Sequence, residues 1–105
     1  MDISRGQIKT ILQRSAPTLR EQLDVDNAFT ISLVAKEVLK DEERRIIDDI
    51  HIMQLRVDKL LDTMTRKPPT AYQSFVQVLL DDENTRDLYN AVKSIEQKVY
   101  QGACL

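Results

Sequence analysis

The side chains that could do chemistry in this 105-residue chain are few and poorly placed for catalysis. His51 is the only histidine, and a nucleophile–base pair would need to bring it to a serine or to the single cysteine, Cys104. His51 falls in an expected connection between helices, where a surface or capping role is the simpler interpretation, and Cys104 falls in an expected tail. One cysteine also excludes a disulfide framework and a cysteine-based zinc site.

Two pairs of adjacent carboxylates, Asp48-Asp49 and Asp81-Asp82, are the remaining candidates for acid–base chemistry or for binding Mg²⁺. Neighbouring residues of a helix point about 100° apart, and neither pair has the spacing of an EF-hand calcium loop. A solvated face is the simpler interpretation of both pairs. The chain also contains no P-loop and no GxGxxG motif, so the sequence predicts no enzyme, no metal and no cofactor.

The elements that carry these residues are expected to be helices of one domain. Two glycines are too few for the tight turns of a compact β-protein, whereas apolar residues recur at spacings of three and four. Pro17 interrupts the first pattern and predicts a kinked or two-part helix, with Ser15 capping the second part. The six expected helices cover approximately residues 3–23, 26–39, 41–50, 52–65, 70–80 and 84–99. We expect an all-α, antiparallel six-helix bundle over residues 1–100, followed by a flexible tail at 101–105.

Local signals predict the helix starts and the buried faces. Asp26, Asp41 and Thr70 are expected to cap the second, third and fifth helices. Periodicity places further apolar residues on buried faces, among them Val38, Ile46, Ile50 and Leu55.

Three regions of the chain carry a resemblance to the caspase recruitment domain (CARD) of the death-fold superfamily. Leu23-Asp24-Val25-Asp26, followed by the run from Ser32 to Leu39, is similar to the junction of helices 1 and 2 and to helix 2 of initiator caspase prodomains. The run from Leu60 to Phe75 resembles the family's helix 4–5 junction, where CARDs commonly show Arg-Gly-Pro and then Ala-aromatic-x-x-Phe. Asp87-Leu88-Tyr89 is similar to the start of the family's helix 6. Lys67 departs from the pattern because it replaces the glycine before Pro68, in a junction that is one residue longer.

The resemblance covers about residues 3–99 and implies a death fold whose activity is binding. It implies homotypic association with another CARD-containing protein, which recruits or activates caspases in apoptotic signalling. The partner would be a caspase, or a scaffold or adaptor of the apoptosome type. The chain would fit the prodomain of a larger cysteine protease, and equally a CARD-only or adaptor regulator of inflammasome-type signalling.

The net charge of −2 conceals a segregation of charge along the chain. Residues 1–23 and 51–67 carry more basic than acidic residues, whereas 24–50 and 68–105 carry more acidic ones. In CARDs, helices 1 and 4 form one surface and helices 2 and 3 the opposite one, and a basic surface meets an acidic one in a type I contact. Such a head-to-tail interface builds rings or open filaments. The basic candidates are Arg14, Arg20, Arg56 and Lys59, and the acidic candidates are Asp26, Glu37, Asp41, Glu42, Asp48 and Asp49.

Three rival interpretations fit the sequence less well. Phosphate binding by a nucleic-acid-binding protein needs a dense basic patch, and here Glu21, Asp58 and Asp62 dilute the cations. No apolar run approaches the ~18 residues of a membrane helix. A bundle that dimerises through its tyrosines is a further alternative, although Tyr72, Tyr89 and Tyr100 are expected in the core or at its rim. The N-terminal residues lack the pattern of a signal peptide, so we expect a cytoplasmic location.

Overall fold

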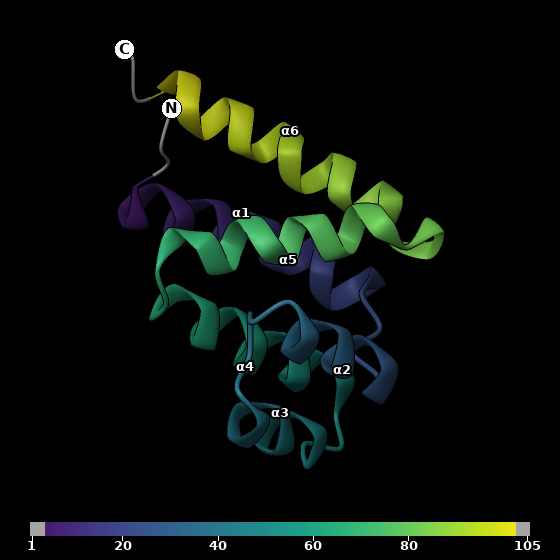
Figure 1. Ribbon diagram of the computed structural model, residues 1–105. Helices are drawn as coiled ribbons and strands as arrows, with labels where there is room; N and C mark the ends of the chain where they lie inside the picture. The colour runs from purple at the N-terminus through teal and green to yellow at the C-terminus, as the bar shows by residue number, and fades with distance from the viewer. Residues whose placement is uncertain (1–3, 103–105) are drawn as a thin grey trace.

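The computed structural model describes residues 4–102, and the side chains of residues 4–100. The described chain folds into six α-helices and one short 3₁₀ helix, η1 (Figure 1). The α-helices are α1 (Arg5–Gln22), α2 (Asn27–Ala35), α3 (Asp41–Asp48), α4 (Met53–Thr65), α5 (Pro69–Asp81) and α6 (Arg86–Gly102), and η1 covers Glu83–Thr85. The prediction of an all-α six-helix bundle is therefore confirmed.

Helix α1 lies at the centre of the bundle and packs against α4, α5 and α6. Helix α2 packs against α3 and α5, and α3 also packs against α4. In Figure 1, α1, α5 and α6 form the upper part of the molecule, and α2, α3 and α4 form the lower part. The first helix packs against the fourth and the second against the third, and the two pairs also meet where α3 packs against α4.

The core is formed by apolar side chains from every helix. Phe29 of α2 meets Phe75 of α5 edge to face, with ring centroids 6.4 Å apart. Aromatic pairs of this geometry add about 0.5–1.5 kcal/mol to the effect of burial alone, so this pair fixes α2 on α5. The largest fully buried side chains include Ile11, Leu12, Leu19, Leu33, Ile47, Leu60, Met64, Tyr72, Phe75 and Leu79.

The first helix is continuous, so of the two predicted alternatives, a kinked helix and a two-part helix, the two-part helix is wrong. Pro17 lies inside α1, and Ser15 is a buried interior residue rather than a cap. Proline removes a single hydrogen bond, the one that would reach the carbonyl of Gln13. Apolar residues before and after it, such as Leu12 and Leu19, are both buried on the same face, and this packing holds the helix together.

Helix α2 ends at Ala35, four residues before the predicted end at Leu39. Glu37 adopts a φ of 62°, in the left-handed region, and it is the only described residue other than glycine with a positive φ. The reversal lets the backbone N–H groups of Val38 and Leu39 donate to the carbonyl of Leu33 at 2.8 and 3.3 Å. These bonds satisfy a carbonyl at the end of the helix and turn Val38 and Leu39 into the core without extending α2.

Of the three predicted helix caps, one is confirmed and two are wrong. The Asp26 side chain caps α2 as predicted, accepting from Phe29 N at 2.8 Å. The residues before the first turns of α3 and α5 are Lys40 and Pro68 rather than Asp41 and Thr70.

Ile46 and Leu55 are about half exposed rather than buried, at 53% and 49%. Helix α3 has only eight residues and buries a single one, Ile47, so it has no room for a wide apolar face. Ile50, predicted on the same face, is only half-buried.

Helix α6 runs to Gly102, so the first two residues of the predicted tail are helical, and 103–105, with Cys104, lie outside the described residues. Within the described part of the chain, no helix is both long and apolar enough to span a membrane.

Candidate interaction surfaces

The basic candidates on α1 point in different directions. Arg20 lies beside α4, where its Nε donates to Asp58 Oδ1 at 2.5 Å, and Lys9 lines the same α1–α4 groove. Arg14 is exposed and lies about 140° around the helix axis from Lys9 and about 120° from Arg20, so it faces away from this groove. It forms no ion pair with any of the described residues, and its charge is therefore available to a partner molecule.

Arg56 of α4 is engaged with the protein's own backbone. Its Nε, Nη1 and Nη2 donate to three carbonyl oxygens: Ile50 at 2.6 Å, Val25 at 2.9 Å and Asp48 at 2.8 Å. The planar guanidinium can make all three bonds at once because its donors diverge in a fixed geometry. Arg56 thus joins the α1–α2 and α3–α4 connections, which gives it a structural role.

Lys59, also on α4, faces a different neighbourhood from Arg14 and Arg20. It lines a groove of about 380 Å³ between α3 and the end of α4. The other lining residues are Lys40, Glu43, Ile46, Thr63, Arg66 and Lys67. The structure therefore does not bring the four basic candidates into one patch.

The groove holds one internal ion pair, between Lys67 and Glu43. Lys67 Nζ lies 2.7 Å from Glu43 Oε1, and the backbone N–H of Lys40 donates to the same oxygen at 2.8 Å. Burial alone would raise the pKa of Glu43, but these hydrogen bonds and the charges of Lys67 and Lys40 lower it below its usual value. Glu43 therefore stays ionised and neutralises Lys67.

The acidic candidates of α3, with Asp49 directly after it, divide into exposed and engaged side chains. Glu42 and Asp49 are exposed and form no ion pair with any of the described residues, while Asp41 is exposed beside Arg44 at 3.4 Å. Asp48 accepts from Thr30 Oγ1 at 3.0 Å and pairs with Arg44 at 3.3 Å, so it fixes α3 on α2. Of this group, Glu42, Asp49 and Asp41 can meet a partner.

Asp26 and Glu37 flank α2 at its two ends. Asp26 caps the helix, and Glu37 occupies the left-handed turn after it; both are exposed. Helix α2 itself contains no charged residue between these ends. Helix α4 contains two acidic and two basic residues within its bounds. The segregation of charge counted along the sequence thus lies in α1, in α3 and in the connections that flank α2, and not in the bodies of α2 and α4.

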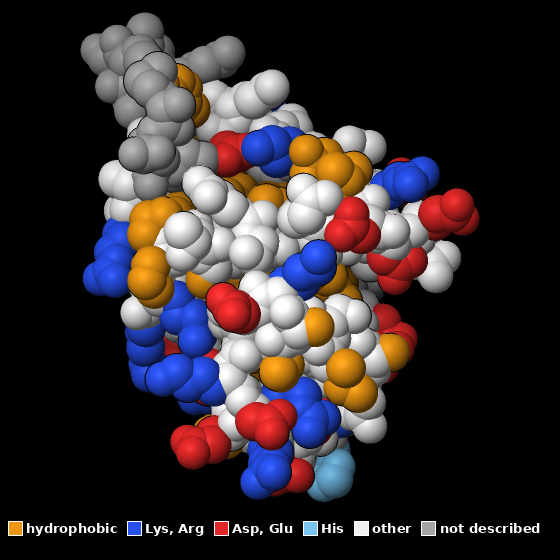
Figure 2. Space-filling view, in the orientation of Figure 1, with side chains coloured by type: hydrophobic (Ala, Val, Ile, Leu, Met, Phe, Trp, Pro, Cys, Tyr) orange, Lys and Arg blue, Asp and Glu red, His pale blue; other side chains and the backbone are white. Residues whose placement is uncertain are grey.

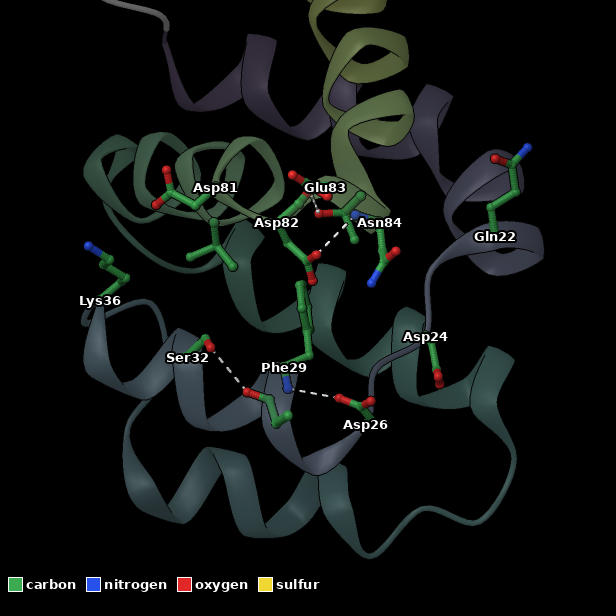
Figure 3. A pocket seen from close by; sticks show the side chains of 13 residues that line it. Gln22, Asp24, Asp26, Phe29, Ser32, Lys36, Asp81, Asp82, Glu83 and Asn84 are labelled. Atoms are coloured by element: carbon green, nitrogen blue, oxygen red, sulfur yellow. Dashed lines mark hydrogen bonds between the residues drawn. The ribbon is translucent and has the colours of Figure 1, made fainter.

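A larger acidic hollow was not predicted from the sequence, in which the Asp81-Asp82 pair was interpreted as a solvated face. The hollow measures about 850 Å³ and lies between α2 and the junction of α5 with α6. Figure 3 shows Asp82, Glu83 and Asn84 above α2, with Asp26 and Asp24 at one end and Lys36 at the other. Its charged lining residues are Asp24, Asp26, Asp81, Asp82, Glu83 and Lys36. The only sequence signal was the run of carboxylates, because their approach to Asp24 and Asp26 depends on the fold.

The candidates for chemistry stay dispersed. His51 is exposed in the connection between α3 and α4. Asp81 and Asp82 line the acidic hollow, where Asp82 accepts from Asn84 N at 2.9 Å. Over residues 4–102, no group of histidine, cysteine, aspartate and glutamate side chains is arranged to hold a metal ion.

Comparison with known families gives one match. The model of the caspase recruitment domain matches residues 9–94, which span α1 to the middle of α6. Neither the curated proteins nor the solved structures gave a match. CARDs are non-catalytic domains that bind other CARD or death-fold domains, in agreement with the helical bundle and its charged surfaces. This chain belongs to the caspase recruitment domain family and is a module for homotypic protein–protein interaction.

Proposed function

We propose that this domain associates head to tail with another CARD through oppositely charged surfaces and thereby recruits a caspase. The observation that carries the proposal is the pair of exposed charges at Arg14 of α1 and Glu42 of α3. Neither enters an ion pair among the described residues, so each can meet an opposite charge on a second molecule.

The charge arrangement supports an interface between two different surfaces. A basic surface on one molecule and an acidic surface on the next leave one free surface of each kind at the ends, so further copies can add. Complementary charges speed the encounter and penalise wrong partners. Attached catalytic domains would then be held at a high local concentration, which is how a domain without catalytic residues promotes caspase activation.

The roles of the basic candidates differ in this proposal. Arg14 contacts the partner directly, Arg20 contributes at the α1–α4 groove while paired with Asp58, and Arg56 maintains the backbone around it. On the acidic side, Glu42, Asp41 and Asp49 form the contact surface. Asp48 positions α3 for that contact.

The test combines two variants that each remove one surface, Arg14→Glu and Glu42→Lys. Each variant alone should lose sedimentation as oligomers, and the variant without the surface that a caspase-prodomain CARD contacts should lose capture of that CARD. An equimolar mixture should recover a dimer, because the intact Arg14 surface of one variant can meet the intact Glu42 surface of the other. Lys98→Glu, an exposed change on α6, serves as the control. Unchanged association of both variants, or no recovery on mixing, would contradict the proposal.

A further inference from the structure

The groove between α3 and the end of α4 carries an excess of positive charge that the fold does not neutralise. Four cations and one carboxylate line it. Glu43 forms an ion pair with Lys67, and Arg66 forms an exposed ion pair with Asp62 at 2.9 Å. The side chains of Lys40 and Lys59 form no ion pair among the described residues.

The cations are also gathered in one place. Figure 2 shows Lys and Arg side chains clustered at the lower left of the view, over the region where Figure 1 places α3 below the turn from α4 to α5. The Lys67 side chain is only 16% exposed and is paired with Glu43, so this wall of the groove is ordered without a ligand. Lys59 is half-buried, so its charge lies within the groove and is only partly exposed to solvent.

The volume of the groove and the charged side chains that line it suit a small polyanion. Its volume of about 380 Å³ lies in the range of small-molecule sites, which begins near ~300 Å³. Ile46 is its one apolar lining side chain, so an apolar peptide helix would find little surface to bury. Arg66 presents a planar fork that suits the oxygens of a phosphate, while Lys40 and Lys59 act as point charges.

We infer that this groove binds a small molecule with at least two neighbouring phosphate groups. The same chemistry is offered by a free polyphosphate and by a phosphorylated lipid headgroup. Lys40, Lys59 and Arg66 contact the phosphates, while the Glu43–Lys67 pair shapes the wall. Lys59 was a candidate for the CARD contact in the sequence, but it lies in this groove, away from Arg14 and Arg20, and the proposed association does not use it. The inference is therefore independent of that association.

The experiment is calorimetric titration of the full chain with tripolyphosphate and with inositol hexakisphosphate at about 150 mM salt, where non-specific attraction is screened. We expect saturable binding at one site. The double variant Lys40→Gln/Arg66→Gln should raise Kd by about tenfold or more, because charge-assisted bonds to phosphate are lost. A matched double variant, Lys36→Gln/Lys98→Gln, removes the same charge from exposed positions outside the groove and should leave Kd within about twofold.

Any of the following titration results would overturn the inference: no saturable binding, an equal loss in the matched variant, or equally tight binding of a glutamate peptide of the same charge. Vesicles that contain phosphatidylinositol bisphosphate distinguish the two sources. If the ligand is a lipid headgroup, the chain must bind these vesicles, and tripolyphosphate must displace it from them. Equal binding to phosphatidylserine vesicles would also overturn it, because that lipid carries a single phosphate. Circular dichroism melts of both double variants establish that they remain folded.

Discussion

Lys67 Nζ lies 2.7 Å from Glu43 Oε1, and this ion pair joins the turn after α4 to the first turn of α3. Lys67 stands where the resemblance of this junction to CARDs predicts a glycine. The turn needs no glycine here, because Lys67 does not have a positive φ. A side chain at this position therefore causes no backbone strain and adds a contact between α3 and α4 that a glycine could not make.

The first prediction concerns the charge of Glu43. Glu43→Gln keeps an acceptor for the Lys40 N–H but loses the ion pair, and it should lower the free energy of unfolding at pH 7 by about 1 kcal/mol. The pKa of Glu43 is lower in the folded than in the unfolded chain, so its contribution is present above the usual glutamate pKa. It should be lost as the pH falls below about 4.5 and through the lowered folded value. Urea unfolding between pH 7 and pH 3 measures the difference.

The neighbouring residue provides the control. Glu42 is exposed and has no ion-pair partner among the described residues, so Glu42→Gln should change stability by less than about 0.5 kcal/mol at every pH. A deficit of Glu43→Gln that persisted unchanged at pH 3 would show that the loss came from packing and not from charge.

The second prediction separates the structural role of Arg56 from its charge. Arg56→Lys retains the charge but cannot reach three carbonyl oxygens, so it should lower the free energy of unfolding by about 2–4 kcal/mol. Arg45→Lys, at an exposed position of α3, is the matched control and should be neutral. Urea denaturation of both variants gives the comparison. If Arg56→Lys is as stable as the parent chain, the three hydrogen bonds contribute nothing net.

The third prediction concerns the left-handed turn after α2. Glu37 has a φ of 62°, which costs a side-chain-bearing residue about 1–2 kcal/mol and costs glycine nothing. Glu37→Gly should remove this strain and raise Tm by about 4–8 °C for each kcal/mol of strain removed. Glu37→Ala removes the same charge but keeps the strain, and should bring no gain. Equal gains in both variants would assign the effect to charge repulsion.

The parts of the fold that the sequence could predict depend on neighbours along the chain. Helical periodicity identifies six helices, and the Asp26 cap follows from a contact only three residues away. The role of Arg56 could not be predicted, because its acceptors at Val25, Asp48 and Ile50 approach it only after the helices pack. The same holds for the acidic hollow, whose carboxylates come from residues 24–26 and 81–83.

The assignment of charge to helices also depends on where each helix begins and ends. Counting by expected helices made the second helix acidic, but its acidic residues lie in the flanking connections once α2 is bounded at Asn27 and Ala35. Helix ends depend on tertiary packing and on single turns such as that at Glu37, which local propensity describes poorly. The candidate surfaces must therefore be defined from the folded chain.

The last prediction tests why α1 remains one helix. Pro17 costs α1 a hydrogen bond to Gln13 O, and packing of the apolar residues on both sides compensates for it. Pro17→Ala should restore that bond and raise the free energy of unfolding by about 1 kcal/mol, a net value because proline also restricts the unfolded chain. Pro69→Ala is the control: Pro69 is the first residue of α5, where no intrahelical bond is missing, so no gain is expected there. Hydrogen exchange adds an independent measurement, since the new amide at position 17 should be protected as strongly as its helical neighbours. An unprotected amide without a gain in stability would mean that α1 is interrupted at this residue in solution.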